Sequence, residues 1–431
     1  MLFFISAIGV GAAQTAAPVQ PQALFPARQI WQMQESGTTA GLRGIDSVDG
    51  TVAWASGTGG TVLRTTDGGA HWQKCAVPDA AKDGASLDFR GVQAWDAKTA
   101  IVMASGPGDK SRLYKTTDGC EAWTLLLKNA DPEGFYDAFT FWDRKHGFLL
   151  GDPVKSMSFA RDNPTFMDSY KKHWVEKLKE PKFLTLETRD GGAHWEHWPV
   201  RHADLIDPGA EGGAAFAASN SLAVIPPQDD PSGAREDPDA STSGWIGVGG
   251  KGGPRVIQGF NLMPDVVGPG AEAYGFAWAK PTPVPLAGGT ESSGVFSLAY
   301  RDSHRPETEV FYRGGGGAYL SNWQLIAVGG DYTKPSDGTG TSAWSDDSGR
   351  HWTASERPPH GFRSAVQWSE VLKAWITVGT NGSDISRDDG KTWQSLDDGN
   401  WNALSLPFVV GPGGRIARLN PQCLTSTSIQ P

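Results

Sequence analysis

Three arginines occupy the same position in three similar short segments of the chain. Each segment has the form apolar–Arg–small–apolar, and the arginines are Arg43, Arg90 and Arg363. A guanidinium group binds a carboxylate through two parallel hydrogen bonds, so arginines that meet on one surface can recognise an acidic ligand. The alternative is that they form ion pairs with carboxylates of the chain itself, such as Asp46 or Asp96, and brace neighbouring elements.

Other polar residues stand at equivalent places in related segments, namely Tyr136, Asp137 and Asn402. Two carboxylates at a defined separation would permit glycoside hydrolysis, and Asp143 and Asp152 lie close to Asp137 in the sequence. The spacing alone gives no distance between these groups. Both interpretations, a binding face and a hydrolytic site, therefore stay open.

Several other chemistries lack their motifs in the sequence. The chain contains no Gly-x-Ser-x-Gly, no His-Glu-x-x-His, no Cys-x-x-Cys and no dinucleotide fingerprint. We therefore expect no metal site and no cofactor. The net charge of −10 argues against a nucleic-acid partner, which would favour a basic face.

The elements that position these residues are marked by five related octets, four of the form Ser/Thr-x-Asp-(x)-Gly-x-x-Trp. In a turn of this type the Asp accepts backbone hydrogen bonds, the Gly supplies a positive φ and the Trp opens the next strand. One octet carries Cys120 in place of the Gly. A calcium loop would need a Glu at its twelfth position, which is absent. The structural residues predicted on these turns are Asp67, Asp118, Asp190, Asp347, Asp388, Trp72, Trp123, Trp195, Trp352 and Trp393.

A second repeat is an apolar strand that ends in Gly. It occurs seven times, at residues 54–57, 102–106, 148–151, 245–249, 325–329, 375–379 and 408–411. With a strand before it and the octet turn after it, each unit has four antiparallel strands, which is typical of a propeller blade. We predict an all-β, seven-bladed β-propeller whose last blade is completed by the N-terminal strand at 30–33.

The octet resembles the Asp-box, or BNR repeat, of sialidases and many secreted propellers. Over residues 28–420 the whole pattern resembles the seven-bladed photosystem II assembly and stability factor family and its bacterial relatives. This resemblance implies that the octets lie away from the functional face and that an arginine-rich patch binds a partner. A sialidase would use three arginines, a Tyr nucleophile and an acidic residue, but the early Arg-Ile-Pro motif is absent and sialidases typically have six blades.

The ends and insertions of the chain complete the domain prediction. Residues 1–17 are expected to be a signal peptide, because an apolar stretch is followed by small residues, so we expect a periplasmic or secreted protein. No apolar run is long enough for a transmembrane segment in the mature chain. Insertions are expected at 152–183, with an amphipathic helix at 166–180, at 225–243 and at 261–293, and residues 421–431 form a tail.

Three cysteines, Cys75, Cys120 and Cys423, allow one disulfide whose pairing the sequence leaves open. The favoured function is an exported, non-enzymatic scaffold that binds a protein segment or an acidic or glycan ligand. Its site would lie on the face of the propeller at which the first strand of each blade begins. The residues expected there are Arg43, Arg90, Arg363, Tyr136, Asp137 and Asn402. The alternative is a sialidase-like glycoside hydrolase.

Overall fold

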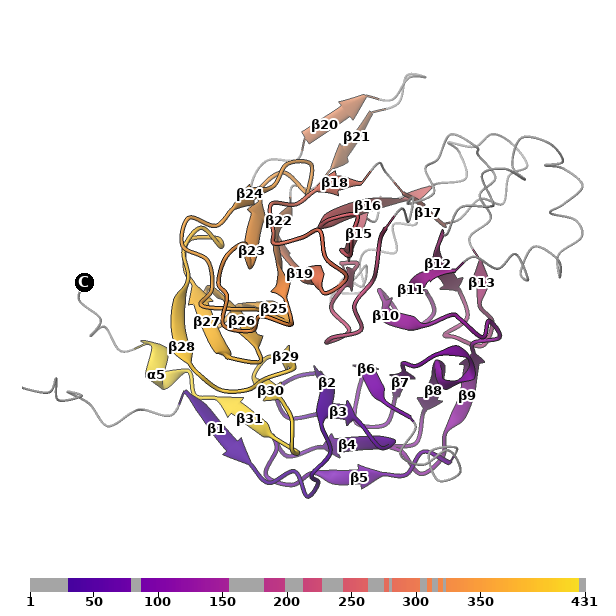
Figure 1. Ribbon diagram of the computed structural model, residues 1–431. Coiled ribbons are helices and arrows are strands. Elements are labelled where there is room, and N and C mark those ends of the chain that lie inside the picture. The colour runs from indigo at the N-terminus through magenta and orange to yellow at the C-terminus, as the bar shows by residue number, and fades with distance from the viewer. Residues whose placement is uncertain are drawn as a thin grey trace, which may run out of the picture.

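The computed structural model is a ring of seven antiparallel blades, shown end-on in Figure 1. It describes residues 30–78, 87–154, 182–197, 212–226, 243–262, 275–278, 281–302, 308–311, 317–320 and 323–425. Each blade contains four antiparallel strands, which follow the sequence order in all blades but the last, and the sheet of blade 4 has a fifth strand. The predicted all-β, seven-bladed propeller is therefore confirmed. None of the helices in the described ranges is long and apolar enough to span a membrane.

The first three blades each contain four consecutive strands of the described chain. Blade 1 contains β2 (Leu42–Ser47), β3 (Ala53–Gly57), β4 (Thr61–Thr65) and β5 (Gln73–Cys75). Blade 2 contains β6 (Phe89–Ala94), β7 (Ala100–Ala104), β8 (Arg112–Thr116) and β9 (Thr124–Lys128), with a short 3-10 turn at Gly108–Lys110. Blade 3 contains β10 (Tyr136–Phe141), β11 (Gly147–Val154), β12 (Lys182–Thr188) and β13 (Glu196–His197).

The remaining blades are less regular. Blade 4 contains β14 (Ala223–Val224), β15 (Ser243–Val248), β16 (Arg255–Leu262) and β17 (Gly275–Trp278), and β18 (Thr282–Pro283) also pairs with β16. Blade 5 contains β19 (Ser293–Asp302), β22 (Trp323–Asp331), β23 (Ser342–Ser345) and β24 (Thr353–Ala354). A separate hairpin, β20 (Thr308–Phe311) and β21 (Gly317–Leu320), projects from it (Figure 1).

The ring closes in blade 7 with strands from both ends of the chain. Blade 6 contains β25 (Ala365–Ser369), β26 (Ala374–Gly379), β27 (Gly382–Ser386) and β28 (Gln394–Asp397), and blade 7 contains β29 (Ala403–Ser405), β30 (Phe408–Val410), β31 (Ile416–Leu419) and β1 (Trp31–Gln34). β1 pairs with β31 from Trp31↔Leu419 onward, so the predicted closure by the N-terminal strand is confirmed. A short helix, α5 (Gln422–Thr425), follows.

The octets form the turns between the third and fourth strands. In blade 1, Asp67 Oδ1 accepts hydrogen bonds from Thr65 Oγ1 and from the backbone N–H of His71, both at 2.9 Å. These hydrogen bonds lower the pKa of Asp67 to about 2. The N–H of Gly68 donates to Thr51 O, which ties the octet to the turn between the first two strands. The octets therefore lie on the lower face, opposite the start of each first strand, which we call the upper face.

The Cys120 variation in the second octet has a structural reason. Cys120 adopts a φ of 69°, in the region that the other octets fill with glycine. Its sulfur forms a disulfide with Cys75, the last residue of β5. The bond joins the outer strand of blade 1 to the octet of blade 2, and Cys423 is outside it.

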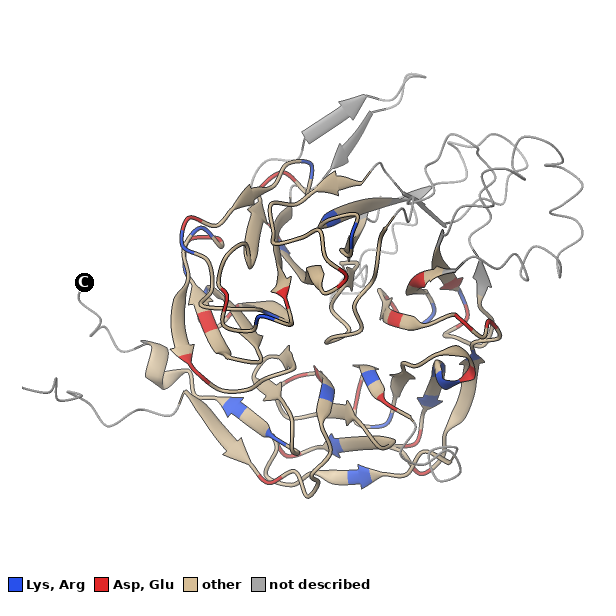
Figure 2. Ribbon diagram, viewed as in Figure 1, with Lys and Arg blue, Asp and Glu red and all other residues tan. Residues whose placement is uncertain are grey.

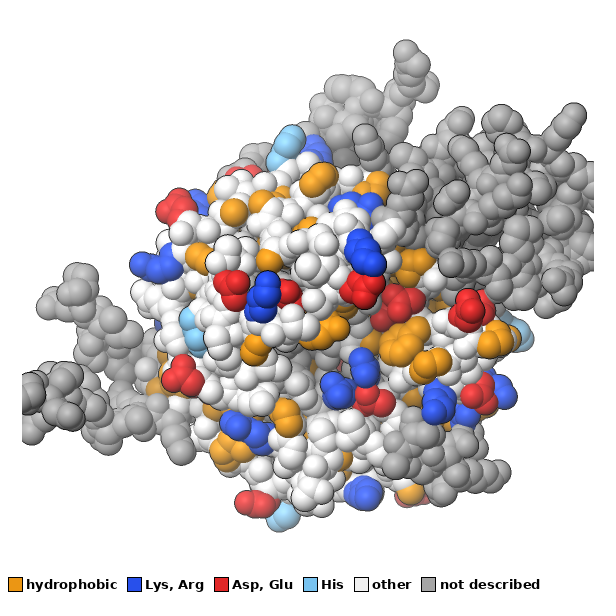
Figure 3. Space-filling model, in the orientation of Figure 1, with side chains coloured by type: hydrophobic (Ala, Val, Ile, Leu, Met, Phe, Trp, Pro, Cys, Tyr) orange, Lys and Arg blue, Asp and Glu red, His pale blue; other side chains and the backbone are white. Residues whose placement is uncertain are grey.

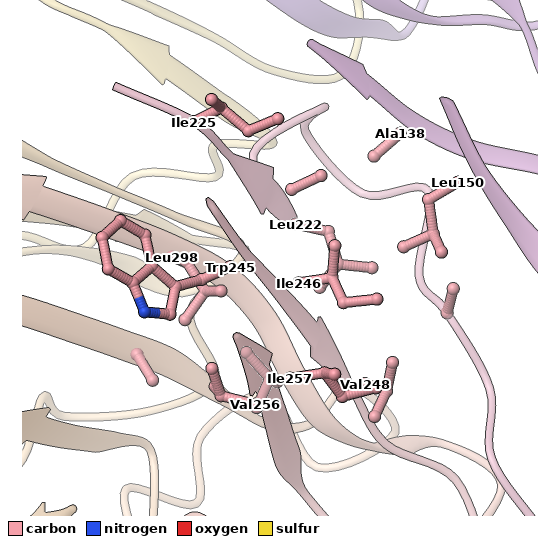
Figure 4. Packing of buried hydrophobic residues seen from close by; sticks show 14 of the residues in the cluster. Ala138, Leu150, Leu222, Ile225, Trp245, Ile246, Val248, Val256, Ile257 and Leu298 are labelled. Carbon is pink, nitrogen blue, oxygen red and sulfur yellow. The ribbon is translucent and has the colours of Figure 1, made fainter. Parts of the chain in front are cut away.

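Apolar side chains fill the spaces between adjacent blades. The largest cluster lies among blades 3, 4 and 5 and surrounds Trp245, whose side chain is fully buried. Figure 4 shows the indole of Trp245 beside Leu298, while Ile246 lies beside Leu222. Burial of a large ring and of several branched side chains stabilises each blade contact by several kcal/mol, at roughly 1.5–3 kcal/mol per side chain.

Polar side chains on the innermost strands add a second connection between blades. Asp46 Oδ2 accepts a hydrogen bond of 2.7 Å from Ala94 N, and Gln93 forms two hydrogen bonds of 2.8 Å with the backbone of Phe141. Gln367 of blade 6 accepts a hydrogen bond of 2.7 Å from Leu406 N of blade 7. Asp46 is the ionisable member of this series, and burial raises its pKa to about 6.

We expect Asp46→Asn to change how stability depends on pH. The folded protein holds the Asp46 proton more tightly than the unfolded chain, whose pKa is near 3.8, so this residue's contribution is full below pH 4 and is lost as the pH rises to 6 and above. The loss amounts to at most about 3 kcal/mol. Urea unfolding between pH 4.5 and 8 measures it. The free energy of unfolding of Asp46→Asn is expected to depend less on pH than that of the wild type and to be higher than the wild-type value at pH 8. Parallel pH profiles for the two proteins would refute this assignment.

Several sequence predictions lie outside the described residues. These are the signal peptide at 1–17, most of the insertions at 152–183 and 225–243, the helix expected at 166–180, and the end of the 421–431 tail. They stay predictions. Of the third insertion, at 261–293, the described part supplies β17 and β18 of blade 4.

Candidate binding face

The candidate residues are positioned by a β-bulge at the start of the first strand. In blade 1 the pairing shifts between Leu42 and Gly44, which leaves Arg43 as the extra residue. The same shift isolates Arg90 in blade 2, Asp137 in blade 3 and Phe296 in blade 5. A bulge re-aims the side chain of the extra residue. Three of the six candidates, Arg43, Arg90 and Asp137, are therefore placed by the same repeated backbone feature.

Arg43 and Arg90 share one carboxylate, that of Asp88. Arg90 Nε donates to Asp88 Oδ2 at 2.8 Å, and Arg43 Nε lies 3.2 Å from Asp88 Oδ1. Arg90 also donates to Ala217 O, and its guanidinium lies over the ring of Phe135. Figure 2 shows basic residues at the start of both β2 and β6, beside the centre of the ring, and Figure 3 shows basic side chains gathered there.

These pairings answer the question left open by the sequence. Asp46 and Asp96, the suggested partners, are engaged elsewhere: Asp46 with Ala94 N, and Asp96 with Arg144 on the lower face. The side chain of Arg43 is 36% exposed and its contact with Asp88 lacks hydrogen-bond geometry at Nε. Two guanidinium groups therefore share the carboxylate of Asp88, and Arg43 is the less constrained of the two.

Arg363 is placed quite differently. It is fully buried and donates to Asp384 Oδ2 through Nε at 2.7 Å and through Nη2. Its Nη1 donates to the backbone O of Phe362 and to Asn381 Oδ1. His360 Nδ1 contacts the other oxygen of Asp384 at 2.8 Å. Arg363 therefore does not join Arg43 and Arg90 at Asp88. It forms a buried ion pair inside blade 6.

Of the three other candidates, Tyr136 and Asp137 are buried and Asn402 is half-buried. Tyr136 is buried, which raises the pKa of its hydroxyl, and its N–H donates to Ser111 Oγ. It pairs with Gly151, so the bulge residue equivalent to Arg43 is Asp137, one position later than the segment comparison suggested. Asn402 donates through Nδ2 to Leu42 O at 2.7 Å, which joins blade 7 to blade 1.

Asp137 is buried and interacts electrostatically with Asp152, which is half-buried. Asp137 is 2% exposed, and burial together with the charge of Asp152 raises its pKa well above the usual value, against the effect of Arg90. Burial also raises the pKa of Asp152, whose Oδ1 accepts from Ala215 N. Asp143 lies elsewhere, in a turn where it accepts from His146.

A part of the chain that precedes β14 enters the middle of the ring, and we call residues 215–221 the central excursion. In blade 4, Ala214 pairs with Gly249 while Leu222 O accepts from Gly247 N, so the bulge of the other blades is greatly extended. Its residues contact four other blades: Ala217 meets Arg90, Asn220 meets Phe139, Ser219 meets Ser364 and Ser221 meets Ser297. Figure 1 shows this chain at the centre, near β10 and β15.

The arrangement favours binding over hydrolysis. A sialidase-like site needs three arginines that converge on one ligand, but Arg363 is buried against Asp384 and away from the pair at Asp88. The central excursion covers Asp137, so this carboxyl is enclosed where a glycosidase would need an accessible acid. Among the candidate residues, Arg43 and Arg90 are the partly exposed cationic pair, with side chains 36% and 29% exposed.

The sequence comparison missed two features of this face. Asp88 precedes the bulge segment and has no counterpart in the arginine pattern, so only the contact itself identifies it. The central excursion was not predicted, because the fourth unit has no clear first strand in its sequence. The residues around Ala215 and Phe216 resemble the first strands of the other units only weakly. That weakness was itself the signal of an irregular strand.

Comparisons with known proteins establish the fold. No protein-family model and no curated protein sequence matches the chain. Among solved structures, YCF48 from Cyanidioschyzon merolae is 15% identical with a TM-score of 0.50, covering 91% of this chain and 99% of that one. A structure of YCF48 bound to D1 peptide is 15% identical with a TM-score of 0.48, covering 90% and 96%. A Niastella koreensis GH74 enzyme is 14% identical with a TM-score of 0.31, covering 88% of this chain and 56% of that one.

At these identities the likeness concerns the fold, and it is consistent with the resemblance noted in the octets and strands. The chain, a seven-bladed β-propeller, thus shares its fold with YCF48 from Cyanidioschyzon merolae.

Proposed function

We propose that this protein is an exported, non-enzymatic scaffold that binds an acidic protein segment on its upper face through Arg43 and Arg90. The observation that carries the proposal is that both guanidinium groups flank the single carboxylate of Asp88. The Nε of Arg43 is buried, but the side chain as a whole is 36% exposed. A carboxylate of a partner can therefore bind to the exposed part of Arg43 beside Asp88 and gain charge-assisted hydrogen bonds.

Asp88 acts in this proposal as an internal substitute for the ligand. It occupies the position between the two guanidinium groups that an external carboxylate would favour, and it holds both side chains in place while the site is free. Asp88 therefore competes with an external carboxylate for the same guanidinium groups. This competition predicts that removing the charge of Asp88 strengthens the binding of acidic ligands.

The disulfide supports the exported location. Cys75–Cys120 joins two blades through residues that are both buried, and structural disulfides persist in oxidising compartments. The glycoside-hydrolase alternative receives less support, because Tyr136, the candidate nucleophile, is 2% exposed and burial raises its pKa.

Peptide binding tests the proposal. We expect Arg43→Ala and Arg90→Ala each to weaken binding of a glutamate-rich synthetic peptide by roughly ten- to a hundredfold, because each removes a hydrogen-bond donor to a charged group. Asp88→Asn is expected to strengthen the same binding. Fluorescence anisotropy with a labelled peptide, at low and physiological salt, measures all three.

Arg144→Ala is the matched control, since Arg144 is an exposed, ion-paired arginine on the lower face. It loses the same charge and is expected to bind as the wild type does. A glutamine-rich peptide of equal length is expected not to bind. Equal losses in Arg144→Ala and Arg43→Ala would mean that only net charge matters, and would contradict a site at Arg43 and Arg90.

A further inference from the structure

An aromatic cluster lies next to the arginine pair on the upper face. Phe216 in the central excursion stacks on Phe296, with ring centroids 4.0 Å apart. Phe362 and Tyr332 contact Phe296 edge-on, at 4.7 Å and 6.0 Å. Phe296 itself is buried, but Phe216 is half-buried and Tyr332 is 51% exposed. Two rings of the cluster are therefore accessible to a partner.

Two glycines of the backbone, Gly249 and Gly294, leave the space that the ring of Phe216 occupies. The bridge between Gly249 and Gly294 lies directly beside its ring, and a Cβ at Gly249 would stand 2.7 Å from Phe216 Cε2. Cβ atoms essentially never approach other atoms this closely, so any other residue at Gly249 would displace the ring. Gly294 adopts a φ of 155° and leaves the same space open.

Tyr332 is held on a braced turn. Asp331 Oδ1 accepts hydrogen bonds from Ser292 Oγ at 2.7 Å, from Thr333 Oγ1 at 2.7 Å and from Thr333 N. Tyr332 N donates to Ser292 O. An exposed aromatic ring on a fixed turn loses little conformational entropy when it is covered, which is typical of residues that dominate interfaces.

The rings and the arginines are joined through adjacent residues. Arg90 Nη1 donates to Ala217 O, and Phe216 immediately precedes Ala217. Phe216 is therefore one residue away from the group that Arg90 contacts, and Tyr332 is linked to Phe216 through Phe296. An extended peptide, at roughly 3.3 Å per residue, can contact both the arginines and the cluster. An acidic side chain at the arginines would place a residue a few positions away over the aromatic cluster.

We infer that the segment bound on the upper face combines a carboxylate with an aromatic side chain two to four residues away, and that Tyr332 and Phe216 form the subsite for this ring. This inference rests on the proposed function, because the arginine pair supplies the first anchor. Aromatic pairs in edge-on or offset geometry add specificity beyond the apolar area that they bury. The partner is thus an acidic–aromatic protein segment.

The test compares two synthetic peptides on the full-length protein. One carries two glutamates followed, three positions later, by a tyrosine, and the other has alanine in place of that tyrosine. We expect the tyrosine peptide to bind wild-type protein on the order of tenfold more tightly. In Tyr332→Ala the difference between the peptides is expected to disappear, and Tyr332→Phe is expected to retain it.

Leu125→Ala serves as the control, because Leu125 is an exposed apolar residue on β9, the outer strand of blade 2. It is expected to keep the full difference between the peptides. If both peptides bind equally to wild type and still depend on Arg43, the aromatic subsite is wrong while the proposed function stands. If neither peptide binds, both the subsite and the proposed function are overturned.

Discussion

Replacing Asp384 with alanine is expected to lower the free energy of unfolding by about 3–5 kcal/mol, because it leaves the buried Arg363 without a counterion. Arg363 is 0% exposed and Asp384 is 1% exposed, so water cannot replace the lost carboxylate. Two hydrogen bonds from Arg363 and one contact from His360 depend on Asp384. Urea unfolding followed by tryptophan fluorescence measures the loss.

A matched exposed pair provides the control for this prediction. Lys373 and Glu370 form an ion pair on the surface of the same blade, with both side chains 72% exposed. Glu370→Ala is expected to change stability by less than about 1 kcal/mol, since exposed pairs contribute little. An apolar double replacement, Arg363→Met with Asp384→Leu, is expected to recover much of the loss. If Asp384→Ala lowers the free energy of unfolding no more than Glu370→Ala does, Arg363 finds another partner and the prediction is wrong.

Removal of the disulfide is expected to lower stability by about 2–4 kcal/mol, because the bond closes a loop in the unfolded chain. The two cysteines are 45 residues apart and connect two blades. Cys75→Ala leaves Cys120 at a φ of 69°, a region that costs energy for a residue with a side chain. Thermal unfolding, with and without reductant, measures the effect of the bond.

Two further variants separate the bond from the backbone. Cys75→Ala with Cys120→Gly also lacks the bond but restores the glycine found in the other octets, so we expect it to recover up to about 1 kcal/mol relative to Cys75→Ala. Reductant is expected to destabilise wild type and to leave both variants unchanged. Equal stability of wild type with and without reductant would contradict a stabilising role for the bond.

The fold was predictable because its signals are local and repeated. Each octet contains the acceptor, the positive-φ residue and the ring of one turn within eight residues, as seen from Thr65 to Trp72. The glycine-ending strands repeat seven times, and the seventh unit lacks an outer strand. The strand that begins at Trp31 therefore pairs there, with β31. Local chemistry of this kind needs no knowledge of distant contacts.

The binding face depended on contacts that repeats do not encode. Arg43, Arg90 and Arg363 share a sequence position, yet two share Asp88 at the surface and the third is buried with Asp384. What differs is the segment that packs over each bulge, and that segment can be far away in the sequence: Ala217 is 127 residues from Arg90.

The sequence by itself thus determined the seven blades, the octet turns and the closure of the ring, because short-range hydrogen bonds and strand periodicity specify them. Only the tertiary structure decided which arginines face solvent, which cysteines pair, and where the central excursion meets Arg90 and Phe296. These outcomes depend on burial and on the charge of neighbours from other blades, and the sequence order of a propeller does not place such neighbours side by side.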